Sequence, residues 1–142
     1  MEELQQCGAE GIITNSYIIY KNPELKKKAE EEGVHSMLGW EKPIMTDSGT
    51  FQSHVYGEIE MEPEVILNFQ KKIGVDIGTV LDVFTEPGTR FEEAKKELDE
   101  TQKRIEEADN NKEDMMLAAP VQGGRHPVSY THLRAHETEA DL

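Results

Sequence analysis

Three polar side chains stand at or just beyond the carboxyl ends of three successive apolar runs. Asp47 follows the run PIMT, Asp82 follows GTVL, and Gln122 follows AAPV. In a parallel α/β fold the strands end at one side of the sheet, where ligands bind, so we expect these side chains to converge on one pocket. Two carboxylates that accept hydrogen bonds and an amide that donates them could together recognise a neutral purine-like base.

Residues beside these three could complete a base-binding site. Ser48 directly follows Asp47, and Phe51, four residues after Asp47, could stack on a flat ring. Gly123 and Gly124 would let the backbone approach a ligand closely, because glycine has no side chain. Each feature also has an ordinary structural interpretation, since an aspartate after a strand is commonly a helix cap and paired glycines usually form a turn. The spacing alone therefore indicates a pocket and no particular reaction.

Short apolar runs alternate along the chain with polar stretches of helical character. Strands are expected over residues 11–20, 43–46, 75–83 and 115–121. Helices are expected over residues 24–32, which Asn22-Pro23 begins and Gly33 ends, from Pro63 to the residue before Gly74, and over residues 91–108. This alternation of strands and helices predicts an α/β fold of parallel strands joined by right-handed crossovers, either a barrel or an open doubly wound sheet.

Two of these helices have a clear apolar side. In the helix that begins at Pro63, the residues on this side are Val65, Ile66, Phe69 and Ile73. In residues 91–108 they recur at steps of three and four, and they are Phe91, Ala94, Leu98, Thr101, Ile105 and Ala108. On the opposite side of the second helix, the ion pairs expected at a spacing of four are Glu92–Lys96, Asp99–Lys103 and Glu100–Arg104. Both helices are predicted to cover a sheet.

The composition excludes several classes of function. The chain has 142 residues, and its 29 acidic against 15 basic residues give a net charge of −14, which argues against a main electrostatic contact with nucleic acid in this segment. No apolar run approaches the roughly 20 residues of a membrane span. The acidic start MEELQQ is unlike a secretory signal, so a cytoplasmic location is expected. The single cysteine, Cys7, cannot form an internal disulfide or a zinc site by itself.

Several strings resemble the signatures of the tRNA-guanine transglycosylases. Residues 46–52, TDSGTFQ, resemble the DSG-x-FQ signature, and residues 121–124, VQGG, resemble a second signature in the same order and spacing. The strings TNSY (14–17), HSMLGW (35–40), VDIGTVLDVFTEP (75–87) and Tyr56-Gly57 resemble the archaeal branch, the archaeosine tRNA-ribosyltransferases. The resemblance extends from about Leu4 to Pro127.

The resemblance implies a role for each matching residue. Asp47 resembles the family's active-site aspartate beside the bound base, as an acid/base or positioning group, and Ser48 and Phe51 resemble residues that contact and stack on the base. Asp82 resembles the carboxylate that recognises the purine edge. Gln122, with the backbone of the two glycines that follow it, resembles the part that holds the base carbonyl.

The resemblance also implies a reaction for the parent enzyme. It exchanges guanine at position 15 of tRNA for 7-cyano-7-deazaguanine in archaeosine biosynthesis, through a covalent link between an aspartate and the ribose C1′. Two displacements at one carbon retain its configuration, as in retaining glycosidases. In the family, the nucleophilic aspartate and the Cys/His zinc site lie on later parts of the barrel. No residue of this chain matches them. Zinc, tRNA-binding domains and a homodimer are therefore expected of the parent and not of this chain.

The number of strands predicts an incomplete barrel. A (β/α)8 TIM barrel takes about 250 residues, whereas this chain has four candidate strands. Residues 1–127 are therefore expected to form a partial catalytic barrel of about four β/α units, a fragment that is inactive alone and that exposes an apolar face. The alternative is a non-catalytic purine-binding half-barrel or a paralogue of the archaeosine pathway, and an aspartate with a Cys/His cluster in the downstream gene sequence would separate the two.

Residues 128–142 depart from the family pattern. Their sequence, VSYTHLRAHETEADL, resembles translated sequencing-adaptor read-through, so we expect a disordered tail that is not part of the family domain. His132 and His136, followed by Glu137, could place two imidazoles on one side of a helix. This segment has neither the HExxH order nor a third ligand, so no metal site is expected in it.

Overall fold

The structure is a computed structural model in which residues 2–52 and 61–126 are described. The expected tail over residues 128–142, with its two histidines, and the pair Tyr56-Gly57 lie outside the described residues. The elements in chain order are α1 (Glu2–Gln6), β1 (Ile12–Asn15), α2 (Ser16–Lys21), α3 (Pro23–Leu38), β2 (Ile44–Asp47), α5 (Pro63–Lys72), β3 (Ile77–Thr79), α6 (Phe91–Asn111) and β4 (Met116–Ala118).

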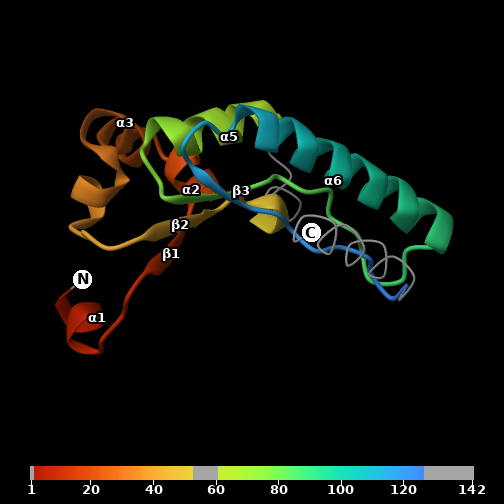
Figure 1. The fold of residues 1–142 in the computed structure, drawn as a ribbon, viewed down its shortest axis with the longest axis horizontal. Helices are drawn as coiled ribbons and strands as arrows, with labels where there is room; N and C mark the ends of the chain where they lie inside the picture. Colours follow the sequence, from red (N-terminus) through yellow and green to blue (C-terminus); the bar gives the residue numbers. More distant parts are fainter. Residues whose placement is uncertain (1, 53–60, 127–142) are drawn as a thin grey trace, which may run out of the picture.

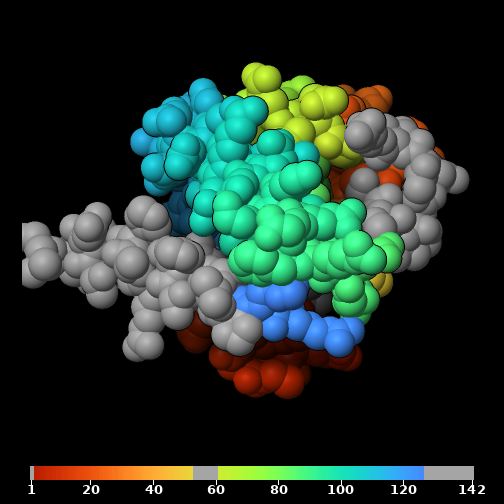
Figure 2. Space-filling view, turned by 90° about the vertical axis from the view of Figure 1, so that its right-hand side faces the viewer, coloured from red at the N-terminus to blue at the C-terminus, as the bar shows by residue number. Residues whose placement is uncertain are grey.

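The four described strands form one parallel sheet in the order β1-β2-β3-β4. Each strand lies beside the next strand in the sequence, and helices connect them. Figure 1 shows α5 and α6 lying along one side of the strands, and Figure 2 shows α6 spread over one face of the molecule with α5 above it. The predicted α/β class with parallel strands is confirmed.

The two sides of this sheet differ in how well they are covered. Ile13, Met45, Ile77 and Met116 are successive neighbours in the strand register and form one row across the four strands. At the two ends of this row, Ile13 is 64% exposed and Met116 is 58% exposed, whereas Ile44, which points to the opposite side, is fully buried. The helices therefore cover one side of the sheet, and apolar side chains on the other side stay accessible in the described part of the chain.

The boundaries of α3 follow its capping residues. The Asn22 side chain accepts hydrogen bonds from the backbone N–H groups of Glu24 and Leu25, and Pro23 follows it, as predicted. Gly33, with φ 79° and ψ 157°, interrupts the helix at the predicted position. A second helical stretch continues to Leu38 and ends at Gly39, which has φ 62°, and this extension was not predicted.

Three predicted strands are shorter in the structure. Of residues 115–121, only Met116–Ala118 form β4. Of residues 11–20, only Ile12–Asn15 form a strand, because the Asn15 side chain accepts from the Ile18 N–H and begins α2. The continuous strand prediction was wrong there, because the apolar residues after Asn15 pack from a helix. Of residues 75–83, only Ile77–Thr79 form β3, although Val80 and Leu81 beyond it are still buried.

The predicted apolar sides of α5 and α6 are mostly buried. In α5, Ile66 and Phe69 are 0% and 4% exposed and Ile73, directly after the helix, is 1% exposed, but Val65 is 40% exposed, so its placement on the buried side was wrong. In α6, Ala94, Leu98, Thr101 and Ala108 are buried, whereas Phe91 is 39% exposed.

The ion pairs along α6 differ in part from the prediction. Arg104 pairs with Glu100 at 3.1 Å, as predicted, whereas Asp99 pairs with Lys95 and Lys103 pairs with Glu107.

Among the described residues, no helix combines the length and the apolar character that crossing a membrane requires.

Candidate functional site

Asp47 is the last residue of β2 and lies beside Asn15, the last residue of β1. Asn15 Nδ2 donates to Asp47 Oδ2 at 2.9 Å, and the Gly49 N–H donates to Oδ1 at 3.2 Å. Ser16 Oγ donates to the Asp47 backbone carbonyl at 2.7 Å. Both carboxylate oxygens and the main chain are therefore held by neighbouring residues, and the carboxylate is fixed at the carboxyl edge of the sheet.

The turn after β2 requires glycine. Gly49 has φ +87°, and a Cβ atom there would lie 2.2 Å from the Cβ atom of Tyr17 in α2. A side chain at this position would collide with α2 and strain the backbone. The close approach of this turn to α2 keeps Asp47 next to Asn15.

Ser48 and Phe51 have different environments. Ser48 is 2% exposed, and its Oγ donates to the Val80 carbonyl at 3.0 Å, so this hydroxyl connects the end of β2 with the segment after β3. Phe51 is 57% exposed, and its ring meets the ring of Phe84 edge to face, with the centroids 5.8 Å apart. Phe51 therefore offers an accessible aromatic ring at this edge.

Asp82 and Gln122 are in direct contact. Gln122 Nε2 donates to Asp82 Oδ2 at 3.1 Å and also to the Val83 carbonyl. Gln122 Oε1 is buried and has no hydrogen-bond partner. The predicted proximity of these two side chains is confirmed, but the amide N–H groups already serve Asp82 and Val83.

The end of β2 also reaches the Asp82 segment. Besides the bond from Ser48 to Val80, Thr50 Oγ1 donates to the Asp82 carbonyl at 3.5 Å, which is a long contact. Gly123 is buried, and the His126 N–H donates to its carbonyl at 3.0 Å across a turn in which Gly124 has φ 54°. The segments that follow β2, β3 and β4 therefore meet at one edge, and a pocket shared by Asp47, Asp82 and Gln122 stays a prediction.

Comparison with known proteins identifies the family of this chain. A family model described as queuine tRNA-ribosyltransferase matches residues 1–140. The chain belongs to this family. A similar relative, the tRNA-guanine(15) transglycosylase of Thermoplasma acidophilum, is 53% identical over 126 residues, which are 89% of this chain and 20% of the relative.

Two further relatives carry the same name. The protein of Picrophilus torridus is 51% identical over 124 residues, which are 87% of this chain and 20% of the relative. The protein of Methanosarcina barkeri is 49% identical over 127 residues, which are 89% of this chain and 26% of the relative. The chain thus spans a fifth to a quarter of the length of these relatives, each of which is named a tRNA-guanine(15) transglycosylase.

A buried glutamine supports the edge of this family domain, and sequence reasoning missed it. Gln70 of α5 is fully buried, and its Oε1 accepts from Thr46 Oγ1 at 2.8 Å and from the Thr79 N–H at 2.9 Å. Its Nε2 donates to the Thr79 carbonyl at 3.0 Å. Gln70 therefore ties α5 to the residue before Asp47 and to the end of β3. The only feature of the sequence that indicated this role was the position of Gln70 on the apolar side of α5, beside Ile66 and Phe69.

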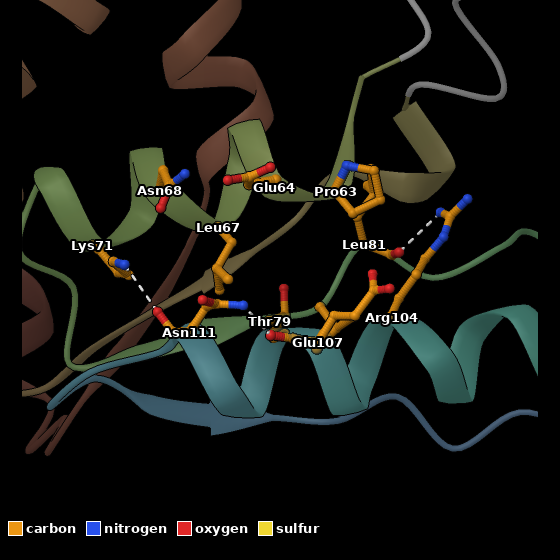
Figure 3. Close-up of a pocket in the computed structure, with 12 residues that line it drawn as sticks. Pro63, Glu64, Leu67, Asn68, Lys71, Thr79, Leu81, Arg104, Glu107 and Asn111 are labelled. Carbon is orange, nitrogen blue, oxygen red and sulfur yellow. Dashed lines mark hydrogen bonds between the residues drawn. The ribbon is translucent and has the colours of Figure 1, made fainter.

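A cleft of about 360 Å³ lies between α5 and α6, but it is separate from the predicted site residues (Figure 3). Glu64, Leu67, Asn68 and Lys71 line it from α5, and Arg104, Glu107 and Asn111 line it from α6. Its two cations are engaged, since Lys71 pairs with Glu113 at 2.6 Å and donates to the Asn111 carbonyl, and Arg104 pairs with Glu100. Nothing in these contacts favours an anionic ligand in the cleft.

The zinc site that the resemblance implies for the parent is not found in the described residues. Across residues 2–52 and 61–126, no group of three His, Cys, Asp or Glu side chains could hold a metal ion. Cys7 is exposed near the start of the chain. The described residues therefore do not fit a zinc ion, and no step of the chemistry below involves one.

Proposed function

We propose that this chain is the base-recognition part of the catalytic domain of a tRNA-guanine(15) transglycosylase. The single observation that carries the proposal is the contact between Asp82 and Gln122 at the sheet edge where Asp47 also ends its strand. The family and the names of the relatives supply the reaction class, base exchange at guanine 15 of tRNA.

The side chains at this edge suit the edge of a guanine-like base. Carboxylate oxygens of Asp47 and Asp82 can accept from ring and amino N–H groups, while the ring of Phe51 can stack on the base. In the structure Gln122 Nε2 already donates to Asp82 and Val83. We therefore expect the donor for the base carbonyl to come from the main chain of Gly123 or Gly124, or from Gln122 after its bond to Asp82 is released.

In the proposed reaction of the parent enzyme, an aspartate outside this chain attacks the ribose C1′. The bond from C1′ to guanine breaks, and guanine leaves with a proton on the ring nitrogen that carried the ribose. The incoming 7-cyano-7-deazaguanine gives up the corresponding proton as its nitrogen displaces the aspartate from C1′. Asp47 is placed as an acid/base or positioning group in this exchange, and no residue of this chain is assigned as the nucleophile.

The four-stranded sheet supports the placement of this chain as about four of the eight β/α units of a (β/α)8 barrel. Its strands are parallel, helices cover one side, and the other side carries the apolar row that begins at Ile13 and ends at Met116. In a closed barrel that row would pack in the interior. We propose that other parts of the parent bind zinc and form its homodimer. They also make most contacts with tRNA, in keeping with the net charge of −14 in this chain.

The first test measures base binding by the chain itself. We expect isothermal titration calorimetry to detect guanine binding to the 142-residue chain and a radiolabelled guanine assay to detect no exchange into tRNA. The variant Gln122→Leu should weaken binding about tenfold, because the amide no longer holds Asp82. Gln6→Leu in α1 is the matched control and should bind guanine normally. A wild-type chain that is folded and does not bind guanine would refute base recognition by this chain alone.

A chimera tests the reaction. Residues 1–126 of this chain replace the matching segment of the Thermoplasma acidophilum relative, with which the chain shares 53% identity. We expect the chimera to exchange guanine in tRNA and the variant Asp47→Ala of the same chimera to lose exchange by at least about 10³-fold. A folded chimera that binds guanine but does not exchange it would instead favour the non-catalytic paralogue.

A further inference from the structure

The segment that carries Asp82 leaves the sheet before it reaches that residue. β3 ends at Thr79, three residues earlier, so a strand ladder does not position the Asp82 carboxylate. Asp47 differs, because it is itself a strand residue in register with β1. The position of Asp82 therefore depends on other bonds to the irregular backbone around it.

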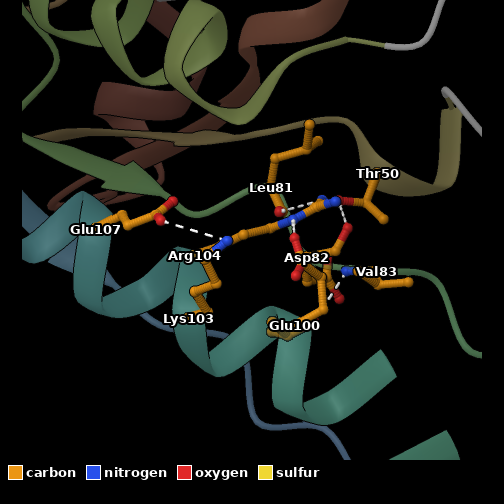
Figure 4. A network of polar contacts seen from close by, with 9 residues as sticks. Thr50, Leu81, Asp82, Val83, Glu100, Lys103, Arg104 and Glu107 are labelled. Carbon is orange, nitrogen blue, oxygen red and sulfur yellow. Dashed lines mark hydrogen bonds and ion pairs between the residues drawn. The ribbon is translucent and has the colours of Figure 1, made fainter. Parts of the chain in front are cut away.

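Helix α6 supplies these bonds on both sides of Asp82. Arg104 Nη1 donates to the carbonyl of Leu81, the residue before it, at 3.1 Å. Thr101 Oγ1 accepts from the N–H of Val83, the residue after it, at 3.0 Å. Figure 4 shows Arg104 reaching from α6 to the Leu81 carbonyl, next to Asp82. Because Thr101 and Arg104 are three residues apart, they lie on the same side of the helix.

Thr101 and Arg104 both bring polar groups to largely buried positions. Thr101 is fully buried in a row of apolar residues, where a valine of nearly the same shape would fill the space, so the hydroxyl is the distinguishing feature. Arg104 is oriented by Glu100, whose Oε1 lies 3.1 Å from Arg104 Nε, and its side chain is only 22% exposed. The polar atoms of both residues are directed at backbone groups on either side of Asp82.

We propose that Thr101 and Arg104 are positioning residues that hold Asp82 in its base-recognition geometry. The proposal deepens and rests on the proposed function, because it assigns the two residues a role through Asp82. By fixing Leu81 and Val83, α6 fixes the direction of the Asp82 side chain toward Gln122. Without these bonds, the backbone after β3 is less constrained and the Asp82 carboxylate samples several orientations.

The test uses the complete chain and separates positioning from stability. The variants are Thr101→Val, which removes the acceptor, Thr101→Ser, which restores it, and Arg104→Met, which keeps the aliphatic stem. Lys103→Met is the matched control, because Lys103 is exposed on the same helix and pairs with Glu107 instead of the Asp82 segment. Guanine affinity is measured by calorimetry at a temperature where circular dichroism shows every variant folded, and amide hydrogen exchange is measured for Val83.

We expect Thr101→Val and Arg104→Met each to lower guanine affinity about tenfold, and Thr101→Val to speed exchange of the Val83 amide about tenfold. Thr101→Ser and Lys103→Met should behave like wild type in both measurements. Wild-type affinity and exchange in Thr101→Val and Arg104→Met would overturn the proposal, as would a loss that Thr101→Ser does not restore. If the wild-type chain does not bind guanine, the proposed function of this chain fails, and Val83 exchange alone decides whether α6 positions the segment.

Discussion

Replacing Gln70 by leucine should strongly destabilise the chain. Gln70 is fully buried between α5 and the sheet and makes three hydrogen bonds, two accepted from Thr46 and Thr79 and one donated to the Thr79 carbonyl. Leucine has a similar size, so packing is largely kept. The substitution therefore tests the hydrogen bonds and not the volume of the side chain.

The expected size of the effect follows from these three bonds. Each intramolecular hydrogen bond contributes about 1 kcal/mol net, which gives about 3 kcal/mol for the set. The polar groups of Thr46 and Thr79 would stay buried without these partners, which increases the loss of stability by about 1 to 2 kcal/mol. Leucine buries more apolar surface than glutamine, which decreases the loss by a similar amount. We therefore expect a loss of about 3 kcal/mol, a large share of the roughly 5–15 kcal/mol typical of a folded domain.

The assay is urea-induced unfolding followed by far-ultraviolet circular dichroism, with the free energy of unfolding obtained by linear extrapolation. The matched control is Asn68→Leu, two residues earlier in α5, where the side chain is exposed. The control should change the free energy of unfolding by less than about 0.5 kcal/mol. A loss below about 1 kcal/mol for Gln70→Leu, or equal losses in the two variants, would refute the stabilising role of this network.

Two further substitutions test the turn after β2 and the opposite end of the sheet. Gly49→Ala should lower the free energy of unfolding in urea by about 3 kcal/mol, because it combines a left-handed backbone with a Cβ atom 2.2 Å from the Cβ atom of Tyr17. The control is Gly39→Ala, where φ is also positive but no atom lies within 4 Å of the added Cβ atom. It should lower the free energy by only about 1 kcal/mol. Equal costs for the two glycines would exclude the clash as the cause. His35→Phe should cost about 1 kcal/mol, because its ring nitrogens lie 2.8 Å from the Trp40 carbonyl and 3.0 Å from the Asp76 carboxylate, and phenylalanine makes neither contact. Urea unfolding measures this loss, and a change below about 0.5 kcal/mol would argue against a stabilising role for the two contacts.

The order of strands and helices was predictable because the pattern that specifies it is local. Apolar runs and helical periods are each contained within one element, so the parallel sheet and α6 follow from the sequence alone. The end of β1 was not predictable in this way. Asn15 both caps α2 through the Ile18 N–H and bonds Asp47, which is 32 residues away, and the apolar residues on either side of it look alike in the sequence.

The candidate site was predictable only at the level of its residues. The spacing placed Asp82 and Gln122 together, but it gave no sign that the Gln122 amide would bond both Asp82 and Val83. Arg104 was predicted as a solvated partner of Glu100, and it does pair with Glu100, but it also reaches the Leu81 carbonyl. Contacts between distant segments decide these geometries, and a periodic pattern does not contain them.

The two aspartates of the candidate site are held by different means, which divides it into two parts. Asp47 is fixed by the register of β1 and β2 and by Asn15, so changes in α6 should leave its orientation intact. Asp82 follows the end of β3 and depends on side chains of α6 and on Gln122, so the same changes should reorient it. Since a side-chain bond is easier to release than a strand ladder, we expect rearrangement on base binding to be concentrated at Asp82 and Gln122, while Asp47 remains a fixed reference point.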